Sequence, residues 1–208
     1  MTKEENVIRY YVICNKLKDT IRTGWKDWNV QKERIESVAE HIFGTQMLAI
    51  AMKSEFDYDI DIMKVVFMLA IHELGETIIG DLTQFQISKE EKMKIEHDAV
   101  HKILKDLIDG EELENLFLEF DEKKKKEAIF AYNCDKLECD IQSKLYEKYV
   151  DLNKQEGNTT FNNSEVQALL KENNSFSDMW IKFGQKKYNY DENFMAVSNY
   201  VLNNNIEN

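Results

Sequence analysis

The stretch IMKVVFMLAIHELGETIIGDLT, residues 62–83, decides how the rest of the chain is interpreted. Its first ten residues carry only one charge, which is typical of a helix that is buried on nearly all sides. His72, Glu73 and Glu76 follow directly, and Asp81 comes a few residues later. Ionisable groups at the end of a buried helix are costly unless they are paired or bind a cation. One imidazole cannot neutralise three carboxylates, so we expect a metal ion here.

The composition limits the classes of function. The 208 residues include 39 acidic and 27 basic side chains, for a formal net charge of −12. Such a chain is poorly suited to a long polyanion, whose binding depends on Lys and Arg, although a small phosphate ester can still bind where cations are local. It has no apolar run long enough to span a membrane, a charged N-terminal segment, and three cysteines without framework spacing. We expect a reduced, cytoplasmic protein that does not bind nucleic-acid polymers or membranes.

The pattern of apolar residues predicts an all-α protein. Proline is absent, glycine occurs seven times, and apolar residues recur at spacings of three and four. Helices are expected over residues 4–19, from 37, over 62–79, from 88 to about 110, over 111–120, from 123, and over 164–171, 175–188 and 191–203. We expect a helical metal-binding core over residues 1–150 and a C-terminal helical extension over 151–208 within the same compact unit. The aromatic-rich extension is expected to act as a cap, a homodimer contact, or both.

His41 is the first candidate ligand outside the opening stretch. Ser37 and Glu40 form a capping-box pattern, which fixes the start of the second helix. Helical spacing from that start places His41 on or beside an apolar stripe that contains Val38, Ile42, Thr45, Ala49 and Met52. A lone histidine in such a place is more often a hydrogen-bonded core residue, but His72 downstream favours a ligand.

Asp135 is the acidic residue of the long sixth helix whose position predicts a binding partner. It adjoins an apolar stripe, with Ala128 and Ala131 on its own side. Small neighbours leave room for another helix or for an ion. Glu138 lies on the same side and is expected to support Asp135.

Other motifs have plainer alternatives. His97 and His101 are four residues apart and are a possible metal pair, but their segment is amphipathic and charged, which favours a solvated face or a helix contact. The sequence HELGE shares only two letters with the zinc-protease motif H-E-x-x-H, which argues against that class. Trp25 and Trp28 lie in an irregular segment with cations, where they either meet a ligand or simply cover the core.

The order of these motifs resembles the HD-domain metal-dependent phosphohydrolase superfamily, whose pattern is H…HD…D on helices of an all-α bundle. More narrowly, it is similar to the family of the 5′-deoxynucleotidases and the related eukaryotic HD-domain hydrolases. The matching stretches are RTGW (22–25), ESVAEH (36–41), HELGETIIGDLT (72–83) and CDKLE (134–138). The chain departs from the pattern in having His-Glu where the superfamily has His-Asp.

The resemblance implies a role for each matching residue. The ligands of one divalent ion, among Mn, Co, Ni, Zn, Fe and Mg, would be His41, His72, Glu73 and Asp135. Glu76 would position or deprotonate the attacking water, and Asp81 would orient water or substrate. Arg22 would hold the phosphate and Trp25 would line the sugar or base. Arg22 and Trp25 are separated by two residues here, which resembles the eukaryotic branch of the family.

These roles predict a phosphohydrolase that releases phosphate from nucleoside 5′-monophosphates, with deoxynucleotides favoured by the resemblance. A two-metal phosphodiesterase or oxygenase is an alternative, because His97 and His101 lie between the His-Glu pair and the last Asp. A non-catalytic nucleotide sensor is another, although Glu76 and Asp81 argue against it. The simplest alternative is a hydrogen-bonded core network that binds no metal.

Overall fold

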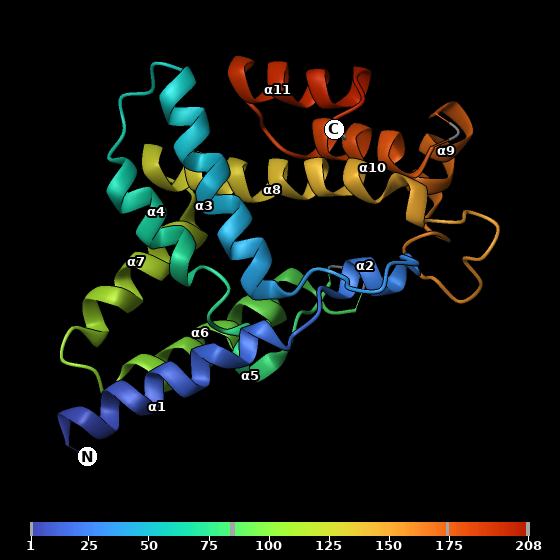
Figure 1. Cartoon of the computed structure of the whole chain (residues 1–208). Helices are drawn as coiled ribbons and strands as arrows, with labels where there is room; N and C mark the ends of the chain where they lie inside the picture. The colour runs from blue at the N-terminus through green and yellow to red at the C-terminus, as the bar shows by residue number, and fades with distance from the viewer. Residues whose placement is uncertain (1, 84–85, 174, 207–208) are drawn as a thin grey trace. The chain divides into compact units, whose positions relative to one another are not determined.

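The computed structural model describes residues 2–83, 86–173 and 175–206, and helices dominate it (Figure 1). Across this part of the chain the only strand-like pairing is an isolated antiparallel bridge between Ile21 and Ser37. The all-α prediction is therefore confirmed. The helices are α1 (Lys3–Asn15), η1 (Lys16–Lys18), α2 (Thr23–Asp27), α3 (Val38–Glu55), α4 (Ile62–Ile71), α5 (Glu76–Ile79), α6 (Lys89–Leu104), α7 (Gly110–Glu122), α8 (Lys126–Tyr146), η2 (Glu147–Tyr149), α9 (Ser164–Asn173), α10 (Phe176–Lys187) and α11 (Glu192–Asn203).

Internal contacts divide the chain into two units. The first comprises Met1–Thr23 and Glu36–Tyr132, and the second comprises Gly24–Ile35 and Asn133–Asn208. Helix α8 begins in the first unit and continues without interruption into the second. These boundaries follow contacts and differ from residue 150, where the composition shifts, so a functional division at residue 150 stays a prediction.

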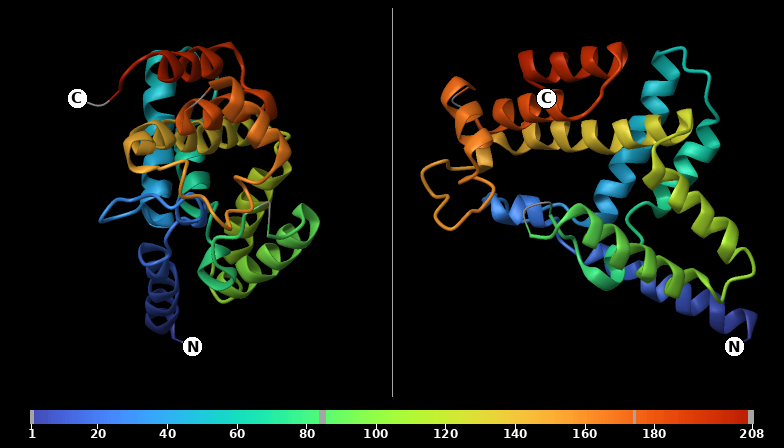
Figure 2. Two further views of the ribbon diagram at one scale, coloured as in Figure 1. Left: turned by 90° about the vertical axis from the view of Figure 1, so that its right-hand side faces the viewer. Right: turned by 180° about the vertical axis from the view of Figure 1, so that it is seen from behind.

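The first unit is built on paired helices. Helix α3 packs along α4, and α6 packs against α5, α7 and α1 (Figures 1 and 2). One cluster of fully or nearly fully buried side chains joins the ends of α4 and α7 to α6: Ile71, Leu74, Val100, Ile103, Leu104 and Phe117. Burying these apolar side chains fixes the end of α4, where the ionisable residues begin.

The start of α3 is as the sequence predicts. The Ser37 hydroxyl accepts a hydrogen bond from the Glu40 amide at 3.3 Å, and the Glu40 carboxylate accepts one from the Ser37 amide at 2.8 Å. This capping box sets the rotation of the helix. The predicted stripe is buried at Val38, His41, Thr45, Ala49 and Met52. His41 therefore points into the first unit and away from solvent.

The third and fourth predicted helices end earlier than expected. Helix α4 stops at Ile71, and α5 begins only at Glu76. Helix α6 stops at Leu104 instead of near Gly110, because the chain turns back there and starts α7 at Gly110. A Cβ at Gly110 would clash with the Leu104 carbonyl, so glycine permits this close reversal.

The second unit has its own aromatic core. The ring of Trp25 lies 5.3 Å from Tyr146 and 4.8 Å from Trp180, measured between centroids. Trp28 packs on Phe176 at 4.9 Å. The interpretation that Trp25 and Trp28 cover the core agrees with this packing. The prediction that their segment is irregular is wrong in part, because the segment contains the short helix α2, which carries Trp25.

The aromatic residues of the C-terminal helices mostly face inward. Phe176, Tyr190 and Phe194 are buried, whereas Tyr200 is 64% exposed. Helix α10 packs against α11 within the second unit (Figure 1), and the ring of Tyr190 stacks on that of Phe194. These aromatics therefore support the core of the extension, and little of their surface is left for a partner.

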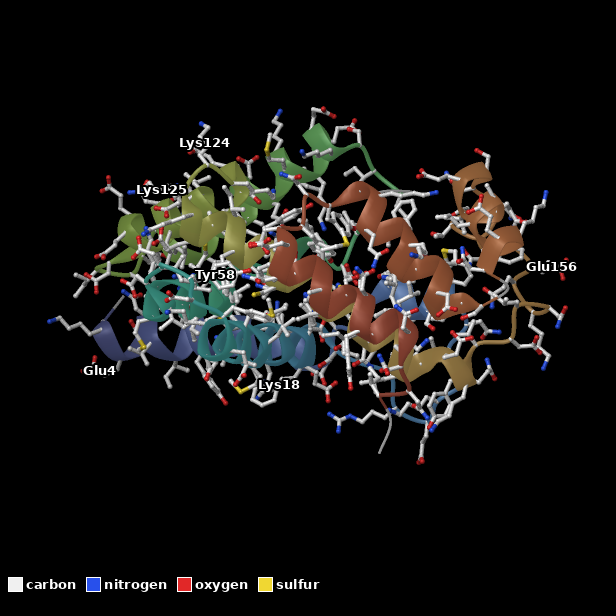
Figure 3. The ribbon with its side chains drawn as sticks, turned by 90° about the horizontal axis from the view of Figure 1, so that it is seen from above. Glu4, Lys18, Tyr58, Lys124, Lys125 and Glu156 are labelled. Atoms are coloured by element: carbon white, nitrogen blue, oxygen red, sulfur yellow. The ribbon has the colours of Figure 1, made fainter. Side chains whose placement is uncertain are left out.

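The run of lysines before α8 forms surface ion pairs. Lys124 and Lys125 project from the surface of the first unit (Figure 3), and Lys125 Nζ lies 2.8 Å from the Glu119 carboxylate. Lys126 Nζ lies 2.7 Å from Asp59. Such exposed pairs contribute little to stability. Across the described residues, no helix is both long and apolar enough to be a membrane-span candidate.

Candidate metal centre

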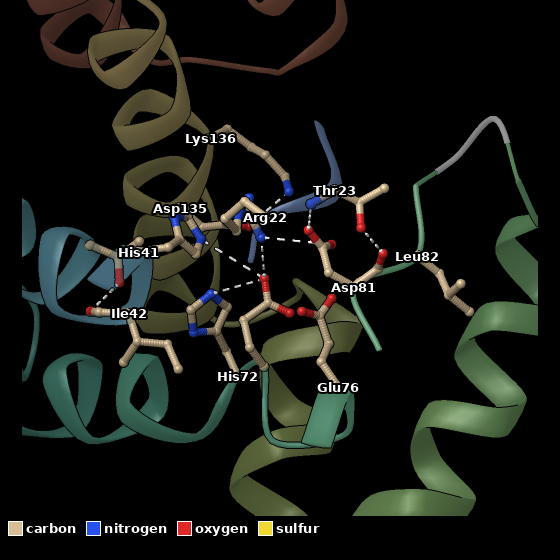
Figure 4. Close-up of polar contacts among 12 residues, drawn as sticks. Arg22, Thr23, His41, Ile42, His72, Glu76, Asp81, Leu82, Asp135 and Lys136 are labelled. Carbon is tan, nitrogen blue, oxygen red and sulfur yellow. Dashed lines mark hydrogen bonds and ion pairs between the residues drawn. The ribbon is translucent and has the colours of Figure 1, made fainter. Parts of the chain in front are cut away.

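His41, His72 and Glu73 converge in the first unit. One ligand atom from each lies within 4.8 Å of the others. Glu73 Oε1 is 3.8 Å from His41 Nε2 and 3.6 Å from His72 Nε2 (Figure 4). His41 is fully buried, and His72 is 3% exposed. Helix α3 supplies the first histidine, and the turn after α4 supplies the other two groups.

The second nitrogen of His72 fixes the orientation of its ring. His72 Nδ1 lies 2.7 Å from the carbonyl oxygen of Leu69. A carbonyl can only accept, so Nδ1 carries the proton, and in the neutral ring the lone pair is then on Nε2, the nitrogen nearer to Glu73 Oε1. A hydrogen bond from the remote nitrogen to a carbonyl or carboxylate is the usual support of a metal-binding histidine.

These residues fit a divalent metal ion. The two distances to Glu73 Oε1 are longer than hydrogen bonds. Two imidazole nitrogens and a carboxylate oxygen form a mixed donor set that suits Zn, Fe, Ni, Co and Mn. The His-Glu dipeptide still brings its carboxylate to the histidines, so the longer side chain of Glu73 does not prevent the three groups from converging.

Arg22 lies beside the acidic side of this centre. Its Nη1 is 3.3 Å from Glu73 Oε1 and 4.0 Å from Asp81 Oδ1 (Figure 4). The Arg22 amide donates to the Glu36 carbonyl at 3.0 Å, which ties the segment to the start of α3. The guanidinium is thus held where a phosphate bound next to Glu73 would meet it.

Asp81 is fixed by the segment that carries Arg22. Its Oδ2 accepts a hydrogen bond from the Thr23 amide at 2.5 Å, and its carbonyl accepts one from the Thr23 hydroxyl at 2.6 Å. Gly80 has a φ of +76°, a conformation that glycine adopts readily, and it turns the chain toward Thr23. The structure thereby joins the RTGW and GDLT stretches, which are distant in the sequence.

Glu76 is buried on the same side. Its residue is 2% exposed, and its Oε1 lies 3.2 Å from Lys92 Nζ. Burial, followed by repulsion from Glu73 and Asp81, raises the pKa of Glu76 well above its ordinary value, while Lys92 and Arg22 act in the opposite direction. A carboxyl group whose pKa is raised is a stronger base than an ordinary carboxylate and is suited to accept a proton.

The turn between α4 and α5 explains how Glu73 and Glu76 come together. The Glu76 amide donates to the Glu73 carbonyl, and the Thr77 amide donates to the Leu74 carbonyl. These bonds span three residues, as in a 3₁₀-helix, where side chains three apart eclipse. The carboxylates of Glu73 and Glu76 can therefore lie within 4.8 Å of each other. The predicted helix over residues 62–79 is therefore wrong at this turn, which is not α-helical.

Asp135 lies on α8, just beyond the residues that belong to the first unit. It is 3% exposed, and its Oδ2 lies 2.8 Å from Lys136 Nζ. Ala128 and Ala131, which precede it on the same face, are fully buried. Glu138 is buried as well. The role of Asp135 as a ligand stays a prediction.

His97 and His101 have other partners. His97 Nε2 lies 2.6 Å from Asp121, and His101 Nδ1 lies 3.0 Å from Glu114. Both pairs connect α6 to α7. Among the described residues, neither histidine belongs to a cluster that could bind a metal ion. The alternative that they form a helix contact agrees with these distances.

Sequence reasoning did not single out Lys92 or Thr23. Lys92 stands in a charged, amphipathic segment and looked like a solvated residue. Its spacing of four from Ser88, the N-cap of α6, was a signal that it lies near the start of that helix. Only the packing of α6 against α5 shows that it faces Glu76.

The fold and the centre together define the class. The chain belongs to the HD domain family, whose model matches residues 14–180. It is 35% identical to the 5′-deoxynucleotidase HDDC2 of Dictyostelium discoideum over 151 residues, which cover 69% of this chain and 78% of the relative. It is 31% identical to the 5′-deoxynucleotidase hdd1 of Schizosaccharomyces pombe over 153 residues, covering 70% of this chain and 75% of the relative.

Solved structures agree on the fold. The PH0347 protein from Pyrococcus horikoshii matches with a TM-score of 0.64 at 23% identity, covering 94% of this chain and 98% of that one. A structure titled as a predicted metal-dependent phosphohydrolase, from Magnetospirillum magnetotacticum, matches with a TM-score of 0.59 at 20% identity, covering 96% and 94%. At these identities the likeness concerns the architecture alone.

Proposed function

We propose that this protein is a metal-dependent phosphohydrolase that releases phosphate from nucleoside 5′-monophosphates, with deoxynucleotides preferred. The observation that carries the proposal is the convergence of His41, His72 and Glu73 beside Glu76 and Arg22 in one unit. The names of the relatives, which are 5′-deoxynucleotidases, support the substrate class.

The metal would be held by His41, His72, Glu73 and Asp135. Two neutral imidazoles and two carboxylates balance the charge of one divalent ion. The candidates are Mn, Co, Ni, Zn, Fe and Mg, as the donor set does not select among them. When bound, the ion lowers the pKa of water and polarises the phosphoryl group. The fourth ligand is proposed because Asp135 matches the last acidic residue of the H…HD…D pattern.

The side chains around the centre have distinct tasks in hydrolysis. Glu76 takes a proton from water as the water oxygen bonds to phosphorus and the bond from phosphorus to the 5′ oxygen breaks. The protonated Glu76 then returns a proton to the leaving alcohol through solvent. Its raised pKa makes Glu76 a stronger base than an ordinary carboxylate, which favours the first transfer. Arg22 binds the phosphate oxygens with its planar pair of donors, and Asp81 orients water or substrate.

The role of Trp25 in lining the sugar or base stays a prediction. The side chain is 2% exposed and packs on Tyr146 and Trp180. A homodimer and a cytoplasmic location also stay predictions. Exposed apolar side chains of α1 (Val7, Ile8, Tyr11 and Val12) offer a surface for the former, and three cysteines that form no disulfide among the described residues support the latter.

The test measures phosphate release from matched ribo- and deoxynucleoside 5′-monophosphates. Protein stripped with EDTA receives Mn, Co, Ni, Zn, Fe or Mg singly. Asp135→Ala should lose the activity, whereas His101→Ala should keep it. No release with any ion, from protein that still binds one, would contradict the proposal and favour a nucleotide sensor. Two ions per chain, or oxygen consumption, would favour the two-metal alternative.

A further inference from the structure

Lys92 on α6 contacts the centre at two points. Its Nζ lies 3.2 Å from Glu76 Oε1 and donates a hydrogen bond to the Leu82 carbonyl at 2.9 Å. The side chain is 27% exposed, and the Glu76 side chain is 1% exposed. The ammonium therefore links the proposed base to the loop residue that follows Asp81.

The approach of α6 to α5 places Lys92 there. A Cβ at Gly75 would lie 2.5 Å from Glu96 Cγ and 3.3 Å from the Glu96 carbonyl, so only glycine allows this packing. Lys92 and Glu96 are one turn apart on α6 and share the face toward α5. The Ser88 hydroxyl accepts from the Glu91 amide at 3.3 Å and fixes the start of the helix.

The surroundings keep Lys92 charged. Burial alone lowers the pKa of a lysine, because a charged group loses its hydration. Here the carboxylates of Glu73, Glu76, Glu96 and Asp81 outweigh burial and raise the pKa of Lys92 above its ordinary value. A cation thus lies 3.2 Å from Glu76 Oε1.

The contact differentiates the two oxygens of Glu76. Oε1 is engaged by Lys92, whereas Oε2 is buried and makes no hydrogen bond within the described part of the chain. We propose that Lys92 is a positioning residue of the hydrolase: it holds Glu76 by Oε1, leaves Oε2 for the attacking water, and fixes the Leu82 segment beside Asp81. This inference rests on the proposed function.

Kinetics of Lys92→Met separate this role from a structural ion pair. We expect kcat to fall roughly 10- to 100-fold, in keeping with a general base that is misplaced while still present. KM for the nucleotide and the affinity for the metal should change less than about twofold, because Arg22 and the ligands are untouched. Lys92→Arg, which keeps the charge and reach, should restore most of kcat. Lys94→Met, an exposed lysine of the same helix, is the matched control.

Hydrogen exchange provides a second measurement that needs no activity. Amides of the Gly80–Thr83 loop should exchange faster in Lys92→Met than in wild type, with α6 itself still protected. An unchanged kcat in Lys92→Met, or equal losses of kcat and metal affinity, would overturn the inference while leaving the proposed function in place. Failure of the wild-type protein to release phosphate with any metal would overturn both.

Discussion

Arg22 Nη1 lies 3.3 Å from Glu73 Oε1, the same oxygen that both histidines of the centre approach. The guanidinium therefore adjoins the oxygen at which the candidate metal ligands converge. Its side chain is 15% exposed, so the contact is partly shielded from water and from salt.

Replacing Arg22 should weaken substrate binding. Arg22→Gln removes charge-assisted hydrogen bonds, each worth about 1.5–3 kcal/mol, so we expect KM for the nucleotide to rise roughly 10- to 100-fold. Metal affinity should stay equal or increase, because Glu73 loses a competing cation. Steady-state kinetics and calorimetric metal titration measure the two effects. The control is Lys124→Gln, which removes an exposed cation; a similar KM in both variants would refute the role.

Metal binding should depend on His72 and not on His101. His72→Ala removes a buried candidate ligand, and we expect loss of both metal binding and activity. His101→Ala removes a contact to Glu114 on the α6–α7 side and should retain both. In wild type, EDTA should lower Tm, since a ligand at 100 times its Kd stabilises the folded state by about 2.7 kcal/mol. Elemental analysis measures the bound metal, and thermal melts measure the effect of EDTA on Tm. A Tm that EDTA does not change would indicate a hydrogen-bonded core network without metal.

Glu76→Gln should remove activity and stabilise the metal-free protein. Loss of a general base costs roughly 10²- to 10⁴-fold in kcat. The pKa of Glu76 is raised in the folded state, so the stability from its neutral form is present below the ordinary pKa. It is lost as pH rises through the folded pKa. Glutamine stays neutral, and the variant should have the higher Tm at pH 7; a lower Tm would contradict the raised pKa.

Gly184→Ala should destabilise the second unit. A Cβ at Gly184 would lie 2.7 and 2.9 Å from the carboxylate oxygens of Asp140, which is fully buried. Overpacking of this kind costs about 1–3 kcal/mol. For a chain of this size each kcal/mol lowers Tm by about 2–4 °C. Circular dichroism melts measure the shift, and an unchanged Tm would show that α10 moves freely away from α8.

Asp140→Asn should flatten the pH dependence of stability. Burial raises the pKa of Asp140 well above its ordinary value, against the hydrogen bond from Tyr190 and the charge of Lys136. The stability that the neutral form of Asp140 contributes is therefore lost as the pH rises from its ordinary pKa to its pKa in the folded protein. Asparagine keeps an acceptor for the Tyr190 hydroxyl, which donates to Asp140 Oδ2 at 2.9 Å. Urea melts from pH 4 to pH 8 should show a smaller decline than in wild type.

Sequence patterns predicted the features that depend on local chemistry. The Ser37 capping box set the phase of α3, and that phase correctly buried His41. The apolar run before His72 correctly predicted a helix, α4, but not its burial on nearly all sides: Val65, Met68, Leu69 and Ile71 are buried, whereas Met63 and Phe67 are exposed. In each case the signal came from residues within a few turns of one another, where helix geometry translates spacing into direction.

Features set by distant contacts were beyond those patterns. The turn after Ile71 is tighter than an α-helix, and it brings the carboxylates of Glu73 and Glu76 close together. The place of Lys92 depends on how closely α6 approaches Gly75. Trp25 sits in a helix of five residues, too short to produce an apolar period. Tertiary packing decides all three.

The close approach at Gly75 has a bearing on how variants of this chain should be judged. A variant that retains every proposed ligand, Glu76 and Arg22, but carries a larger residue at position 75, would pass any motif-based check. Its α6 would nevertheless have to retreat from α5, and Lys92 and Glu96 would move with it. A variant can therefore keep every motif residue and still lose the activity through substitution of a glycine that belongs to none of the proposed ligands.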